Sequence, residues 1–428
     1  MNNTRRHPRV CSRQVVVICS LLLCSTQSLS EPLTLKQATQ LTLQQHPQLQ
    51  KFIPLVRALE GEKEQASLSP VYEIGIQAEN LMGSGNTAGF SESELTVSLS
   101  SVYELGDKLD ARVALADAKL SLLQSEQYVQ SLSLLGDLTE QYVRTLAHQE
   151  RVKLAKLSLS LAQDALEIVK DRVEAGATNE AELLRANATF NQAKLDSASA
   201  EMLLVIAKQS LALFWREEGA NLDIISGSLS SLPSSQQFRL LYQRFLASPN
   251  MERLSNAIDV KDAELALAHS NTSADISWSV GIKRLQDVQD TSIVAGVSLP
   301  LFAGKRNRGA EKAATARKMA TTLDRDSKLL EVKRLLFEAS HYLNFTVQAV
   351  SHLKKSIIPD LQQAMKLTLE GYEQGIYNYQ EWLTSREALI RTQARVIDLS
   401  EAALIHQALI EQWTGLPSHA LSSHRVPE

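Results

Sequence analysis

The chain has 428 residues, with 44 lysines and arginines against 48 aspartates and glutamates, which gives a formal net charge of −4. This slightly acidic balance disfavours nucleic-acid binding, because phosphate recognition needs a basic surface. All three cysteines, Cys11, Cys19 and Cys24, lie near the amino terminus, so the remaining chain has no thiol for a disulfide or a soft-metal site.

Residues 1–30 are predicted to be a secretory signal peptide. An arginine-rich start is followed by the apolar run Val15–Leu23 and by small residues ending at Ser30, after which we expect cleavage. The apolar run is shorter than the roughly 20 residues that a membrane-spanning helix needs. Lipid attachment at Cys24 is disfavoured, because Leu23 stands where that motif has a small residue. No later run of about 18 apolar residues predicts a transmembrane helix.

Two regions, about 71–101 and about 274–299, alternate apolar and polar residues. A period of two is typical of strands with one apolar face, so each region predicts a β-hairpin. Strands of about nine to eleven residues match the length that a tilted strand needs to cross a bilayer. On this interpretation Ile74, Val97, Trp278 and Ile293 face lipid; the alternative is a small soluble sheet lying on helices.

Four strands cannot close a barrel, and open sheet edges are not tolerated in lipid, because unpaired backbone groups there cost several kcal/mol each. A transmembrane sheet therefore requires an oligomer. Three chains would supply about twelve strands, an even number suited to a closed barrel.

Each predicted hairpin is followed by a very long helix, Asp107–Val173 in the first case and Lys305–Tyr372 in the second. Their apolar residues recur at steps of three and four, the period of a coiled-coil seam. Helices of this length, about 100 Å at 1.5 Å per residue, far exceed those of ordinary helical bundles. Pro359 should kink or break the second helix.

The chain is an internal duplication. Arg172–Leu184 and Gly371–Leu383 share Glu, Gly, Asn, Glu and Leu in matching order. We assign a first repeat to 31–232 and a second to 233–428, each consisting of a short helix, a hairpin, a long helix, a tip and another long helix. The tips are predicted at about 172–178 and 371–377. Gly176 and Gly375 should make the turns there, since a helix often ends at a left-handed glycine.

No catalytic constellation or phosphate-binding glycine loop is present in the sequence, so we predict neither an enzyme nor a cofactor. His341 and His352 could share a helix face, but an isolated pair does not make a metal site, and we predict no bound metal. Glu182 and Glu381 occupy equivalent positions after the tips. In an oligomer such acids would form rings that attract cations at a constriction. The alternative is that both are ordinary solvated helix residues.

With these features the chain resembles the TolC family of outer-membrane efflux proteins, closest in its motifs to the heavy-metal efflux subgroup. The resemblance is carried by Glu104–Lys108 with Gly106, by Ser298–Arg306 with Pro300 and Gly304, and by the second tip. Asp107 departs from the family pattern by replacing a usual glycine.

The resemblance implies a mainly α fold with transmembrane β-strands: a homotrimer with a twelve-stranded barrel in the outer membrane of a Gram-negative bacterium and a long periplasmic tunnel of helices. It implies a periplasmic adaptor that docks at the helical tips and an inner-membrane RND-type transporter. It also implies that Tyr372 is a tip tyrosine that hydrogen-bonds between helices at the periplasmic aperture.

The favoured function is thus a passive exit duct of a tripartite efflux pump, with metal cations preferred over drugs as substrate. The alternatives are the outer-membrane duct of a type I protein-secretion system and a periplasmic coiled-coil structural protein.

Overall fold

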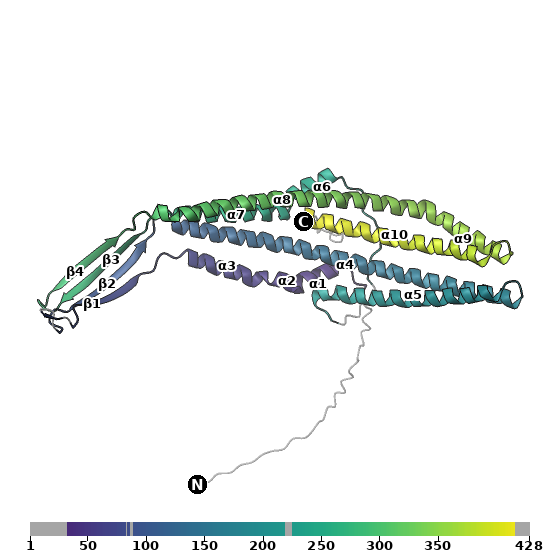
Figure 1. Ribbon diagram of the computed structural model, residues 1–428, viewed down its shortest axis with the longest axis horizontal. Helices are drawn as coiled ribbons and strands as arrows, with labels where there is room; N and C mark the ends of the chain where they lie inside the picture. The colour runs from purple at the N-terminus through teal and green to yellow at the C-terminus, as the bar shows by residue number, and fades with distance from the viewer. Residues whose placement is uncertain (1–31, 83, 86–88, 219–224, 416–428) are drawn as a thin grey trace, which may run out of the picture.

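The computed structural model describes residues 32–82, 84–85, 89–218 and 225–415. The predicted signal peptide, its cleavage after Ser30 and Cys24 all lie outside these residues. The molecule is elongated, with a β-sheet at one end and two helical tips at the other (Figure 1). The prediction of a mainly helical fold with a few strands is confirmed.

The elements of the two predicted repeats follow a similar order of short helices, a hairpin and long helices. The first contains α1 (Leu35–Gln45), α2 (Pro47–Gln50), α3 (Phe52–Ala66), β1 (Glu73–Glu79), β2 (Glu94–Tyr103), α4 (Lys108–Glu174) and α5 (Glu180–Ala212). The second contains α6 (Phe238–Leu246), α7 (Pro249–Ser270), β3 (Ile276–Leu285), β4 (Thr291–Ser298), α8 (Ala303–His352), α9 (Ile358–Glu373) and α10 (Tyr379–Thr414). Helix α7 packs along both α4 and α8, so the repeats lie side by side.

Helix α4 is one unbroken helix of 67 residues, about 100 Å long. The corresponding run of the second repeat is interrupted, as Pro359 predicts. A π-helical turn, Leu353–Ile357, separates α8 from α9, and Pro359 lies in the first turn of α9. The interruption therefore begins upstream of the proline, because the proline ring removes a backbone donor and crowds the carbonyl one turn earlier.

Helix α5 departs from the prediction that no segment after the signal peptide is long and apolar enough to span a membrane. Among the described residues, Glu180–Trp215 is one helical stretch that is long and apolar enough to cross a membrane by length and composition, and most of it is unburied. Counting consecutive apolar residues misses this stretch, because small and polar residues interrupt it. Helix α5 packs against α4 instead, where Gln141 Nε2 donates to Ala207 O over 3.1 Å and Lys156 pairs with Glu201. Its other side is left exposed.

The four strands form one antiparallel sheet in the order β1-β2-β3-β4. The two hairpins meet through β2 and β3, where Ser98 lies opposite Gly281. A Cβ on Gly281 would lie 2.7 Å from Val97 O, so this close approach of backbones requires glycine. The outer edges of the sheet belong to β1 and β4.

Three clusters of buried side chains lie along the helices. One joins α1, α4 and the residues that precede the second repeat, where the hydroxyl of Tyr142 lies within hydrogen-bond distance of two carbonyl oxygens, Leu33 O at 2.8 Å and Ser226 O. A second joins α6, α8 and α10. The third lies at the tips. The helical part thus has several small cores distributed along a rod.

Candidate functional site

Both helical tips have the same backbone geometry. Gly176 and Gly375 have φ of +69° and +77°. Ala177 N donates to Arg172 O and Ile376 N donates to Gly371 O, each over 2.8 Å. These are the hydrogen bonds of a helix that ends at a left-handed residue, which glycine adopts without strain. The duplicated sequence therefore makes a duplicated turn.

The two acids that follow the tips have different partners. Glu381 completes a capping box, because its Oε2 accepts from Asn378 N over 2.9 Å while Glu381 N donates to Asn378 Oδ1 over 3.0 Å. Glu182 Oε2 instead accepts from Thr178 Oγ1 at 2.5 Å and from the Tyr372 hydroxyl at 3.2 Å. Each acid thus bonds within its own chain, and only Glu182 links the two tips.

Tyr372 is the centre of the contact between the tips and is 2% exposed. Its ring stacks on Trp382 with centroids 5.4 Å apart, and Arg172 Cζ lies 4.7 Å from the ring centroid. Arg172 Nη1 also donates to Glu373 O over 2.8 Å. Burial, assisted by the charge of Glu182, raises the pKa of Tyr372 to about 12, so its hydroxyl remains a donor at physiological pH.

These contacts fasten the α4–α5 hairpin to the α9–α10 hairpin. Sliding one tip against the other would break the Tyr372–Glu182 bond, the Arg172–Tyr372 cation–π contact and the Arg172–Glu373 bond together. Tyr372 and Glu182 are predicted site residues, whereas their partners Arg172 and Thr178 are not among the predicted ones. Arg172 and Thr178 both lie within the repeated tip motif, and this position in the sequence could have marked them as candidates.

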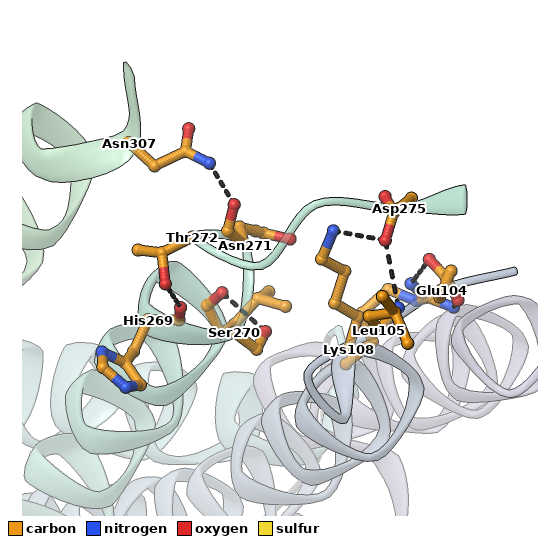
Figure 2. Close-up of polar contacts among 11 residues, drawn as sticks. Glu104, Leu105, Lys108, His269, Ser270, Asn271, Thr272, Asp275 and Asn307 are labelled. Atoms are coloured by element: carbon orange, nitrogen blue, oxygen red, sulfur yellow. Dashed lines mark hydrogen bonds and ion pairs between the residues drawn. The ribbon is translucent and has the colours of Figure 1, made fainter. Parts of the chain in front are cut away.

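The junction between sheet and helices is held by polar contacts between the repeats (Figure 2). Asp275, just before β3, accepts with Oδ1 from Lys108 Nζ at 2.6 Å and from Leu105 N at 3.2 Å. The Lys108 side chain is 8% exposed. Arg112 makes a two-pronged bond to Glu104. Removing Asp275 would leave the buried ammonium group of Lys108 unpaired, so the pair fixes how the first long helix leaves the sheet.

A second contact in Figure 2 ties α8 to the end of α7, where Asn307 Nδ2 donates to Asn271 O. Thr272 Oγ1 donates to His269 O within the turn that ends α7. Both long helices therefore start from anchored positions.

Left-handed residues make the turns from strand to helix. Gly106 and Asp107 have φ of +80° and +55° before α4, and Phe302 has φ of +65° before α8. A Cβ on Gly106 would lie 2.3 Å from Ser273 Oγ. Pro300 lies between β4 and α8, but Gly304 lies inside the first turn of α8 and does not make the turn. Asp107 takes a conformation that aspartate tolerates better than most residues, which explains why it can replace glycine.

The strand register places Ile74, Val97, Trp278 and Ile293 on one face of the sheet. This face is exposed although it is apolar: Ile74 is 77% and Ile293 82% exposed. The polar residues of β2 are the more buried ones. Trp278 is half-buried because Tyr72 packs edge-on against it at 6.3 Å, near the helical end of the sheet. Aromatic residues at this level are typical of a membrane interface.

The described residues contain no group of three metal-ligating side chains. His341 contacts the Phe337 ring at 4.3 Å, which is a packing role.

Comparison with known proteins agrees with this architecture. The chain is 26% identical over 366 residues to the cobalt-zinc-cadmium resistance protein CzcC of Cupriavidus metallidurans, covering 86% of each chain. It is 25% identical over 281 residues to the pyoverdine export outer membrane protein OpmQ of Pseudomonas putida, covering 59% of this chain and 57% of that relative. The fold matches the crystal structure of CusC with a TM-score of 0.75 at 15% identity, covering 90% of this chain and 95% of that one.

Residues 38–215 match the family model described as outer membrane efflux protein. Members of this family are ducts, so the protein is a non-enzymatic channel of the outer membrane. By sequence and by fold, the chain belongs to the outer membrane efflux protein family.

Proposed function

We propose that three copies of this chain assemble into one duct, with twelve strands closing a barrel in the outer membrane. The observation that carries this proposal is the sheet itself, whose apolar face is exposed and whose edges are the outer sides of β1 and β4. In lipid those edges must be paired, and β4 of one subunit can pair with β1 of the next. The apolar face then contacts lipid and the polar face lines the lumen.

The exposed side of α5 supports the same assembly. Leu195, Met202, Val205 and Ile206 are each more than half exposed, on a helix that packs mainly against α4. A stripe of this kind in water is costly at about 25 cal/mol per Å². A second copy of the chain, lying alongside α5, would cover it and continue the wall of helices.

In this duct the helices form a periplasmic tunnel, and the tips are the end that a periplasmic adaptor grips. Gly176 and Gly375 shape the tips that dock, and the Tyr372–Glu182 bond keeps the aperture narrow. An inner-membrane RND-type transporter supplies the energy. The family of the chain supports such partners, because its members are the outer components of tripartite pumps.

Metal cations are the favoured substrate. CzcC, named for cobalt, zinc and cadmium resistance, matches the chain over a larger share than the pyoverdine exporter does. A strain that lacks this protein should therefore lose tolerance to divalent metal salts and keep its tolerance to organic toxicants, as measured by growth inhibition. The opposite pattern would assign the duct to organic substrates.

Cell fractionation tests the assembly. The protein should sediment with the outer membrane, require detergent for extraction, and have the mass of three chains in detergent, because one chain cannot close a barrel. Release of the protein by osmotic shock, or a stable monomer with intact strands, would contradict the proposal.

A further inference from the structure

Three charged side chains meet on the polar face of the sheet. Glu79 lies at the end of β1, Glu94 at the start of β2 and Lys283 on β3. Lys283 Nζ lies 3.1 Å from Glu79 Oε2 and also forms an ion pair with Glu94. The cluster stands beside the hairpin loops, at the end of the sheet farthest from the helices (Figure 1).

The strand register explains why a cation is needed at this place. Glu79 and Glu94 are direct cross-strand partners, and like charges in this arrangement repel across only about 5 Å. Lys283 lies opposite Thr96, which is the next residue of β2 on the same face as Glu94. From there its ammonium group reaches both carboxylates. The lysine therefore neutralises a repulsion that the β1–β2 hairpin creates by itself.

The ammonium group lies between two carboxylates, where without it a free cation would be attracted. Two carboxylates at a short separation are typical ligands of divalent cations. A duct that discharges cations must attract them at its mouth and must not hold them there. A bare carboxylate pair at the exit would attract a cation and retain it.

We propose that Lys283 is a tethered counter-ion at the exit of the duct, which fills the cation position between Glu79 and Glu94 and so prevents discharged metal ions from binding there. This inference rests on the proposed function, in which the polar face lines the lumen and the hairpin loops are external. Each cluster retains one net negative charge, so the mouth still attracts cations weakly, and three clusters surround it in the trimer.

Single-channel recording in planar bilayers tests the inference with ZnCl2 as the probe. Lys283→Gln should show a stronger cation preference in a KCl gradient than the unaltered protein. Zinc should reduce its conductance at concentrations on the order of tenfold lower, because the competing positive charge is gone. Arg284→Gln is the matched control: it removes the same charge one residue along, on the opposite face of the strand, and should leave both quantities unchanged.

A second variant keeps the inference testable if the Lys283→Gln protein does not assemble. Glu79→Gln combined with Glu94→Gln keeps the lysine and should shift the selectivity towards anions and abolish any effect of zinc at the mouth. If either variant forms channels with the selectivity and zinc response of the unaltered protein, the inference is overturned and the proposed duct stands. If the unaltered protein forms no channels at all, the proposed function fails as well.

Discussion

Replacing Ile293 by lysine is expected to abolish assembly of the protein in the outer membrane. Ile293 is 82% exposed on the apolar face, opposite Ile282 of β3. A lysine on the lipid face costs about 2 to 4 kcal/mol at the bilayer midplane and less towards the interfaces. A trimer incurs this cost three times, which is comparable with the whole stability of a typical domain. The measurement is the mass of the species in detergent extracts of outer-membrane fractions, in which the proposed trimer should be lost.

Ser277→Lys provides the control on the polar face, because Ser277 has the opposite side-chain direction from its neighbour Trp278. In a water-filled lumen this lysine stays hydrated, so the amount of trimer should be near that of the unaltered protein. If Ile293→Lys and Ser277→Lys assembled equally well, the sheet would not contact lipid through its apolar face.

Tyr372→Phe should open the periplasmic end of the duct. The change removes only the hydroxyl that donates to Glu182 Oε2 over 3.2 Å, and it keeps the ring on which Arg172 and Trp382 pack. A hydrogen bond to a charged acceptor contributes about 1.5 to 3 kcal/mol, so its loss should favour the open state by roughly ten- to a hundredfold in each subunit. Larger and more frequent open-channel currents in planar bilayers are the expected result.

Tyr377→Phe is the matched control, since Tyr377 lies in the same tip and its ring covers Gly371. It loses the same hydroxyl group without touching the contact between tips. Closed-state conductance that is identical in both variants and in the unaltered protein would show that the Tyr372–Glu182 bond does not hold the aperture.

Periodicity in the sequence was sufficient to predict the elements of this fold. Ile74, Ile76 and Ala78 alternate with polar residues because one face of β1 is apolar, and α4 begins and ends within one residue of the predicted 107–173. Such patterns are local consequences of backbone geometry. Pro359 likewise predicts the break in the second long helix, because proline has no backbone N–H to donate to the helix.

Contacts between distant segments could not be predicted from the sequence. Glu182 and Glu381 are equivalent in the duplication, yet one bonds to Tyr372 and the other caps its own helix. Phe302, and not the nearby Gly304, takes the left-handed conformation before α8. The sequence shows Lys283 as a charged residue on the polar face of a predicted strand. Its two ion-pair partners, Glu79 and Glu94, lie in the other repeat and could not be predicted from the strand alone. Each of these depends on packing that no single segment specifies.

The pairing of β2 with β3 also constrains the order in which parts of the chain can fold. Helices and hairpins form from neighbouring residues and can arise while the chain is still leaving the secretion machinery. The β2–β3 ladder joins residues one whole repeat apart, so it must wait until β3 has been delivered, after α4, α5 and α7. Until then β2 has an open edge that invites pairing with foreign strands. A chaperone that shields this edge would act from the emergence of β2 until β3 has been delivered, while the chain is still being translocated.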